Sequence, residues 1–176
     1  MPNWMMGGLA LISCLGLTTA PAAAKKGAPA APDLKGFIAC EKTNADWTAF
    51  ATAYGQPGAP EAWGWKKASL GTGLLAAYTL KEPLSVFGER VTKIAFSGSG
   101  VVAVLTEDAL PRLVRELKLQ PVTQGPTTKI FGREVRSAVD KTDDMTIATK
   151  ISLSASTSAD YPGVVLAGCS YTIDVR

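Results

Sequence analysis

The residues of this chain with the clearest acid–base chemistry are carboxylates, because the sequence contains no histidine. Their densest group is Asp140, Asp143 and Asp144. Closely spaced carboxylates could serve as the general acid and base of a hydrolase, or as oxygen ligands for calcium. The segment lacks the D-x-D-x-D-G spacing of a calcium loop, so we expect a solvated turn between two strands. A carboxylate-dependent hydrolase is the enzymatic alternative, with these three residues as its candidates.

Other catalytic and cofactor chemistries find no support in the residue pattern. Without histidine, the sequence excludes Ser-His-Asp and Cys-His nucleophile systems and imidazole metal sites. There is no Ser-x-x-Lys motif either. The short glycine-rich turns at 71–73 and 98–100 do not continue into a phosphate-binding loop. We therefore expect a protein that is not an enzyme, with no catalytic residues, no metal site and no cofactor.

The strongest candidate for a binding surface is the segment Trp63-Gly64-Trp65-Lys66-Lys67. Two indoles in a loop with glycine, beside two ammonium groups, could stack on a sugar or peptide and pair with an anionic group. Core packing of a tryptophan, with the lysines in solvent, is the competing interpretation. The residues to test as partner contacts are Trp63, Trp65, Lys66 and Lys67.

A second candidate contact is the run Ser97-Gly98-Ser99-Gly100. This run resembles the serine/glycine loop of small periplasmic inhibitors of C-type lysozyme, a loop that enters the cleft of the enzyme. The resemblance covers four residues, and where that family has a tyrosine shortly after the loop, this chain has Val101-Val102-Ala103. It implies a periplasmic inhibitor of a lysozyme-like enzyme. A β-hairpin turn accounts for the same four residues.

The N-terminus has the features of an export signal. Residues 1–24 carry no charged side chain, and their apolar stretch is shorter than the roughly 20 residues that span a bilayer. Small residues that fit a cleavage site follow, before Lys25. The alternative is a lipoprotein, because Leu11-Ile12-Ser13-Cys14 is similar to a bacterial lipobox, in which the cysteine becomes lipidated. We expect a periplasmic or secreted protein, with membrane contact only through a lipid anchor at Cys14 in the alternative.

Removal or lipidation of Cys14 leaves Cys40 and Cys169 as the two remaining cysteines. An even number of cysteines in an oxidising compartment predicts that they pair. A bridge between them would close a loop of about 130 residues and stabilise the fold by roughly 4–5 kcal/mol, through the entropy of the unfolded chain. Two buried free thiols are the alternative.

The folded domain that positions these residues is expected to span residues 37–176. Residues 25–36 are rich in Ala, Pro, Gly and Lys, and they predict a flexible linker. Apolar residues at helical spacing predict a helix that begins after its N-cap Asn44 and stops at Gly55. The same spacing predicts a second helix over 109–118.

Short apolar runs separated by turn residues predict strands in the rest of the domain. In the last run apolar residues alternate, which places Cys169 on the buried face. The hexapeptide at 86–91 has a similar copy at 130–135, and both predict a tight turn at glycine between two short strands. The order of helices and strands indicates an α+β domain: a mainly antiparallel sheet of about six strands packed by two helices. The predicted runs are 74–80, 84–87, 91–96, 101–105, 129–131, 134–139, 145–155 and 164–175.

Charge narrows the class of partner. Eighteen Lys and Arg against fifteen Asp and Glu give a net charge of +3, too small to indicate nucleic-acid binding. The sequence thus favours an exported, bacterial-type envelope protein that is non-catalytic and binds a partner protein or a cell-wall or glycan ligand. The alternatives are a lysozyme inhibitor and a carboxylate-dependent hydrolase.

Overall fold

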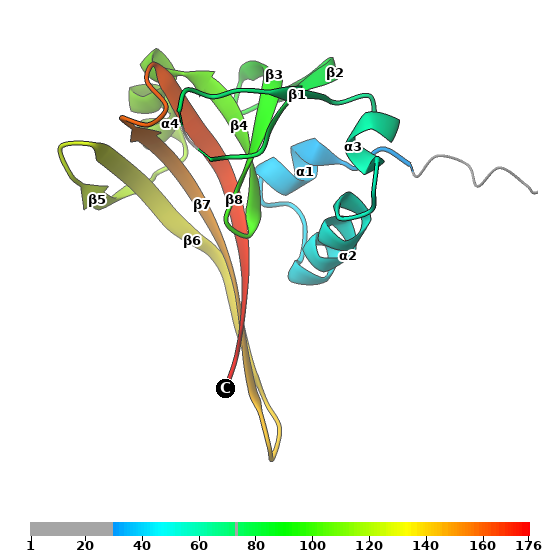
Figure 1. The fold of residues 1–176 in the computed structure, drawn as a ribbon. Coiled ribbons are helices and arrows are strands. Elements are labelled where there is room, and N and C mark those ends of the chain that lie inside the picture. The colour runs from blue at the N-terminus through cyan, green and yellow to red at the C-terminus, as the bar shows by residue number, and fades with distance from the viewer. Residues whose placement is uncertain (1–29, 73) are drawn as a thin grey trace, which may run out of the picture.

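Eight strands form one antiparallel sheet in the computed structural model, which describes residues 30–72 and 74–176. The strand order is β1-β2-β3-β4-β8-β7-β6-β5, so β8 lies between β4 and β7 (Figure 1). All other neighbours in the sheet are consecutive in the chain and pair as hairpins. The strands are β1 (Lys66–Ala68), β2 (Ala77–Val86), β3 (Glu89–Ser97), β4 (Gly100–Thr106), β5 (Gln120–Gln124), β6 (Thr128–Lys141), β7 (Thr146–Ser158) and β8 (Val164–Val175).

Short helices accompany this sheet, and Figure 1 shows α1, α2 and α3 together on one side of it. α1 contacts β2, β4 and β8, α2 contacts β7 and β8, and α4 contacts β7. The predicted helices near 44–55 and 109–118 are confirmed as α2 and α4, and two short helices are present in addition. The helices are α1 (Leu34–Ile38), α2 (Asn44–Tyr54), α3 (Ala59–Ala62) and α4 (Leu110–Glu116), with a 3-10 turn at Glu107–Ala109.

The N-cap of α2 is Thr43 rather than the predicted Asn44. The Thr43 hydroxyl accepts a hydrogen bond from the Asp46 N–H, and the Asp46 carboxylate accepts one from the Thr43 N–H. This reciprocal box satisfies two backbone N–H groups at the end of the helix. Asn44 is instead the first helical residue, and its amide donates to the Thr172 carbonyl of β8 at 3.4 Å.

Aromatic side chains build the core between the helices and the sheet. Phe50 of α2 is only 5% exposed and stacks on Phe37, with ring centroids 4.8 Å apart. Trp47, one turn earlier, stacks on Tyr171 of β8 at 5.4 Å. The aromatic face of α2 is therefore packed against the core, as the helical spacing in the sequence predicts. The connected rings are Phe37, Trp47, Phe50, Tyr54, Trp63, Trp65, Tyr78, Phe96 and Tyr171.

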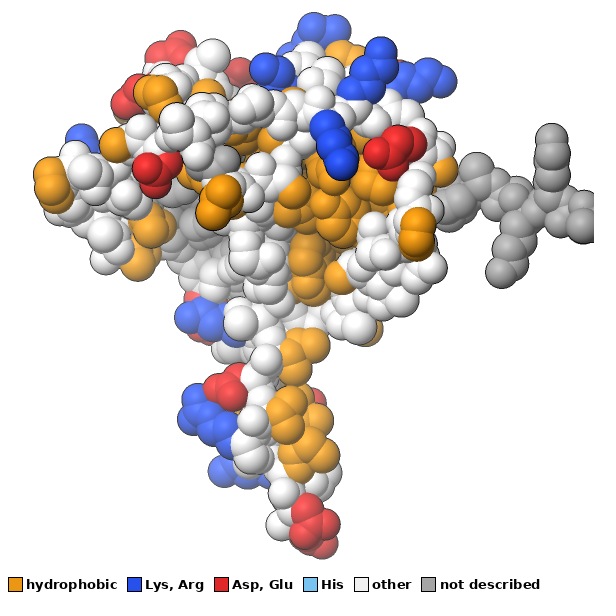
Figure 2. Space-filling view, in the orientation of Figure 1, with side chains coloured by type: hydrophobic (Ala, Val, Ile, Leu, Met, Phe, Trp, Pro, Cys, Tyr) orange, Lys and Arg blue, Asp and Glu red, His pale blue; other side chains and the backbone are white. Residues whose placement is uncertain are grey.

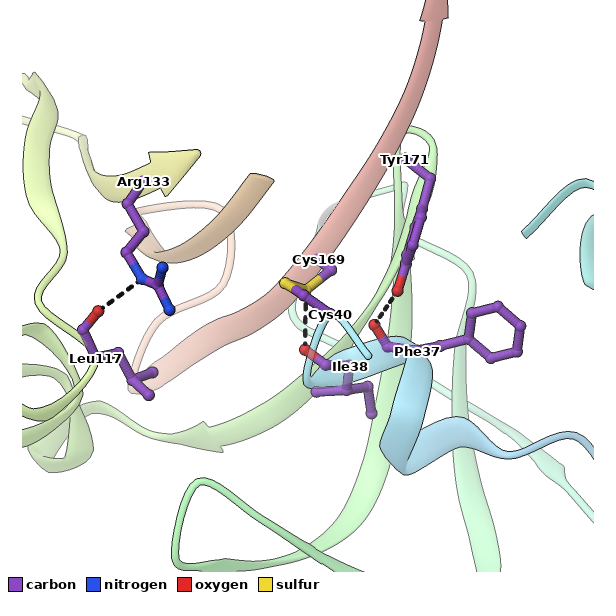
Figure 3. Close-up of a disulfide and its surroundings, with 7 residues drawn as sticks. All are labelled: Phe37, Ile38, Cys40, Leu117, Arg133, Cys169 and Tyr171. Atoms are coloured by element: carbon purple, nitrogen blue, oxygen red, sulfur yellow. Dashed lines mark hydrogen bonds between the residues drawn. A yellow bond between two sulfur atoms is a disulfide. The ribbon is translucent and has the colours of Figure 1, made fainter. Parts of the chain in front are cut away.

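The predicted disulfide between Cys40 and Cys169 is present, and it joins the end of α1 to β8 (Figure 3). The two Cα atoms lie 5.4 Å apart, and both residues are buried. Next to the bridge, the Tyr171 hydroxyl donates to the Phe37 carbonyl at 2.8 Å. The domain therefore begins earlier than predicted: α1 starts at Leu34, inside the segment 25–36 expected to be linker, and Leu34 is buried.

We expect Tyr171 to make the stability of this region sensitive to alkaline pH. Burial raises the pKa of Tyr171 above its ordinary value, because the charged phenolate is poorly solvated in the core. A raised pKa means that the stability from this group is complete below about pH 10, the unfolded value, and is lost as the pH rises above it. We expect Tyr171→Phe to cost about 1–2 kcal/mol at neutral pH, because the Phe37 carbonyl loses its short hydrogen bond and keeps the longer one from the Cys40 N–H at 3.4 Å.

Thermal denaturation of both proteins from neutral pH to above pH 10 tests this expectation. The melting temperature of the wild type should fall toward that of Tyr171→Phe at high pH. If the melting temperatures of the two proteins differed by the same amount at every pH, ionisation of the Tyr171 phenol would not cause the loss of stability at high pH.

The strand count is eight rather than about six, for local reasons. The eight predicted runs form six strands, because 74–80 and 84–87 join in β2 and 129–131 and 134–139 join in β6. The two strands without a predicted run are β1 and β5. The short edge strand β5 is exposed throughout, so no apolar alternation marks it. The prediction of a turn is right for the first hexapeptide copy, since Phe87 and Gly88 connect β2 to β3. It is wrong for the second, because Gly132 lies within β6 opposite Ser154 of β7.

A long β-arm projects from the body of the domain (Figure 1). We define the arm as residues 136–149 of the β6–β7 hairpin together with residues 172–176, which lie beside β7. Its exposed large apolar side chains include Val139, Ile173 and Val175, which are 59%, 47% and 59% exposed. Figure 2 shows hydrophobic side chains along one side of the arm, charged ones along the other and acidic ones at its end.

The predicted export signal at residues 1–24, Cys14 and most of the predicted linker lie outside the described residues. Among the residues that are described, no helix has the length and apolar character needed to cross a membrane.

Candidate functional site

A pocket of about 470 Å³ opens beside α1 and the edge of β2. The segment 31–35, which leads into α1, forms one of its walls. Trp63 and Trp65 form a second wall, and residues 80–84 of β2 form the third. The pocket thus depends on three parts of the chain that only the folded domain brings together.

The β2 wall of the pocket is a bulge in the sheet. Between Thr79 and Leu84 β2 advances five residues (84 − 79), while β3 advances two between Lys93 and Val91 (93 − 91). On its other side, β1 pairs with β2 only as far as Thr79. Residues 80–83 therefore leave the regular ladder, and Pro83, which has no N–H to donate, suits this position. Bulges of this kind re-aim side chains and are frequent beside binding sites.

The two tryptophans predicted as contacts line this pocket from the core. Trp63 is 8% exposed and Trp65 is 6% exposed, and their ring centroids lie 4.8 Å apart. Most of each indole is therefore packed in the core, which agrees with the alternative interpretation of these tryptophans. A small part of each indole lines the pocket. The Nε1–H of Trp63 has no acceptor among the described residues, an uncommon state for a buried N–H group.

Gly64, between the two tryptophans, allows β2 to approach this loop. Its φ is +78°, in the left-handed region that favours glycine. A Cβ at this position would lie 3.2 Å from Cδ and 3.3 Å from Cβ of Lys81. The aliphatic stem of Lys81 therefore packs across Gly64, at the junction of the tryptophan wall and the bulge.

Both signs of charge border the pocket. Lys35, Lys81 and Glu82 are exposed and form no ion pair with another described residue. Asp33, by contrast, is already bound: Lys42 Nζ lies 2.8 Å from its carboxylate, and the Gly36 N–H donates to it at 3.0 Å. These two bonds hold the pKa of Asp33 below its ordinary value. The charges left for a ligand are therefore two ammonium groups and one carboxylate.

The lysines of the predicted contact segment lie apart from its tryptophans. Lys66 and Lys67 are exposed on β1, paired in register with Thr79 and Tyr78, and neither lines the pocket. Successive strand residues point to opposite faces of a sheet, so the two ammonium groups do not act side by side. The structure thus divides the predicted segment into two places, and its role as a partner contact stays a prediction.

The carboxylates Asp140, Asp143 and Asp144 lie at the exposed end of the β6–β7 hairpin. The Thr142 N–H donates to the Met145 carbonyl across this turn at 2.8 Å, so the expected polar turn is present. None of the three carboxylates lines the 470 Å³ pocket or the smaller pockets of about 290 and 250 Å³. Within residues 30–72 and 74–176, no three Cys, Asp or Glu side chains gather so that they could hold a metal ion.

Ser97–Gly100 closes the β3–β4 hairpin. Ser97 pairs with Gly100, so Gly98 and Ser99 are the two turn residues. Gly98 has a φ of +56°, which a type II′ turn requires at its first position. The Ser99 carbonyl accepts a hydrogen bond from the Tyr171 N–H at 2.9 Å, which ties the turn to β8. The β-hairpin turn is confirmed, and the resemblance to a lysozyme inhibitor stays a prediction.

Two walls of the pocket were not predicted from the sequence. Lys35 falls in the segment expected to be a flexible linker, and nothing in the local sequence connects it with Lys81. A signal did exist for the β2 wall, because Pro83 interrupts an apolar run and proline in a strand indicates an edge or a bulge.

Comparison with protein-family models, curated proteins and solved structures found no match to this chain.

Proposed function

We propose that this chain is a non-catalytic binding domain of the cell envelope, and that it takes a small cell-wall glycan fragment in the 470 Å³ pocket. The observation that carries the proposal is the make-up of this pocket. Indole, leucine and proline side chains form its walls, and Lys35 and Lys81 border it without an ion-pair partner among the described residues.

The size of the pocket supports a small ligand. Pockets for small molecules commonly enclose about 300–1,000 Å³, with mostly apolar walls and a few polar groups that fix orientation. A sugar ring offers matching chemistry, because its C–H bonds form an apolar face while its hydroxyl and carboxylate groups form a polar rim. The apolar face would contact Trp65, Leu80 and Leu84, and a carboxylate would pair with Lys35 or Lys81.

The compartment supports a ligand from the cell wall. The disulfide between Cys40 and Cys169 is compatible with an extracellular or periplasmic location. The export signal expected at residues 1–24 would deliver the domain to the same place. A partner protein is the other class of ligand that the sequence favours, and titration experiments can distinguish the two classes.

Isothermal titration of the protein with soluble, carboxylate-bearing peptidoglycan fragments tests the proposal. We expect saturable binding by the wild type. Lys81→Ala should weaken it at least tenfold, because one charge-assisted hydrogen bond is worth roughly 1.5–3 kcal/mol. Lys35→Ala should have a similar effect, because it removes the ammonium group of another wall.

Lys67→Ala is the matched control, since it removes the same charge from an exposed site that does not line the pocket. It should bind as the wild type does. Absence of binding by the wild type would refute the glycan ligand, and equal weakening by Lys67→Ala would refute the pocket as its site. Binding of an envelope protein through Lys66 and Lys67, without glycan binding, would favour the partner-protein alternative.

A further inference from the structure

The outer edge of β6 has a long stretch without a strand partner. β5 pairs with β6 only as far as Gly132, opposite Gln120. At the next residue, the Arg133 side chain donates to the Leu117 carbonyl at 2.9 Å, which covers the edge there (Figure 3). From Glu134 to Lys141 the described residues place no strand on this side of β6. An open edge of this length is a template for pairing with another strand.

Hydrogen bonds around the turn show which backbone groups face this open edge. The Thr142 N–H donates to the Met145 carbonyl, and Thr146 exchanges two bonds with Arg176 on the β8 side. Hydrogen-bonded and non-hydrogen-bonded pairs alternate along an antiparallel ladder. Arg136, Ala138 and Asp140 therefore bond to β7, whereas the backbone groups of Ser137, Val139 and Lys141 point to the open edge.

Two opposite charges on this stretch lack a partner. Arg136 and Asp140 are both exposed, and neither forms an ion pair with another described residue. They lie on one face of the sheet, because their β7 partners are Ile151 and Ile147. They are four residues apart and flank Ala138 symmetrically.

We propose that the open edge of β6 pairs antiparallel with the same edge of a second copy of this chain, about a two-fold axis at Ala138. In this register Arg136 lies opposite Asp140 of the second copy, and the two-fold axis repeats the pair. These are non-hydrogen-bonded positions, where facing side chains come closest. Ser137 of one copy lies opposite Val139 of the other. The N–H and C=O groups of these two residues point to the open edge, so they form reciprocal hydrogen bonds.

The charges select this register over its neighbours. Moving the axis to Ser137 sets Arg136 against Ala138 of the second copy, so both Arg136–Asp140 pairs are lost. Moving the axis to Val139 sets Asp140 against Ala138 and leaves both charges unpaired. Charged residues on an edge deter pairing with unrelated strands, and here they complement those of a second copy.

Charge reversal tests the interface by sedimentation velocity on the full chain. The wild type should dimerise reversibly. Arg136→Asp and Asp140→Arg should each weaken dimerisation at least tenfold, because each variant opposes like charges twice. An equimolar mixture of the two variants should dimerise again, since every reversed charge then meets its opposite in the heterodimer.

A backbone test complements the charges. Val139→Pro removes an N–H that faces the open edge and leaves the bonds between β6 and β7 in place, so it should abolish dimerisation while the melting temperature changes little. Val139→Thr keeps the N–H and should dimerise as the wild type does. A monomeric wild type, a mixture that stays monomeric, or a dimeric Val139→Pro would each overturn the proposal.

Discussion

Replacement of Cys40 and Cys169 by alanine should lower the free energy of unfolding by about 4–5 kcal/mol. The bridge joins residues 129 positions apart, so its loss restores a large loop-closure entropy to the unfolded chain. Urea denaturation of the wild type and the double variant measures the difference. This would be a large part of the stability of a domain of this size.

Reduction of the wild type is the control for this prediction. The reduced protein and the double alanine variant should have the same free energy of unfolding, because both lack only the cross-link. Both should also bind the ligand more weakly, since the bridge fixes α1 and the segment 31–35 forms a pocket wall. A loss below about 1 kcal/mol would show that the core holds α1 without the bridge.

Phe50→Ala should lower the free energy of unfolding by about 3–5 kcal/mol, which is typical for a buried phenylalanine. Phe50 lies at the centre of the aromatic cluster, stacked on Phe37 at 4.8 Å and on Trp63 and Phe96 at 6.0 Å. Its removal leaves a cavity between α2 and the sheet. Urea denaturation, with near-ultraviolet circular dichroism as a report on aromatic packing, checks the result.

Two further substitutions calibrate this effect. Phe50→Leu keeps most of the apolar volume and should cost about 1–2 kcal/mol. Leu74→Ala removes a side chain that is fully exposed and should change the stability by less than about 0.5 kcal/mol. If Phe50→Ala cost no more than Leu74→Ala, the aromatic cluster would not be the centre of the core.

The parts of the fold that the sequence predicts are those with a local signature. α2 follows from aromatic residues at helical spacing, and β8 follows from the alternation that places Cys169 in the core. α1 has no such signature, because five residues are too few to show a period or to form a stable helix alone. Burial of Leu34 and Phe37 against the sheet, and the disulfide at Cys40, stabilise it instead.

The candidate site was predictable only in part, for the same reason. Trp63 and Trp65 stood out by residue type, and they do border the pocket. Lys66 and Lys67 were selected because they follow Trp65 directly in the sequence, yet their place on β1 keeps them out of the pocket lining. Lys35 and Lys81 join the site through contacts between distant segments, which no local pattern records.

We propose that a cell-wall glycan fragment binds in the pocket beside Trp63 and Trp65. A nitrogen–proton correlation spectrum, recorded while a carboxylate-bearing peptidoglycan fragment is added, tests it most directly. We expect the indole N–H signals of Trp63 and Trp65 and the amide signals of 31–35 and 80–84 to shift in a saturable manner. The Trp47 indole, packed against Tyr171 away from the pocket lining, should not move. An unchanged spectrum, or shifts confined to the Lys66–Lys67 edge or the arm, would show that the fragment does not bind in this pocket.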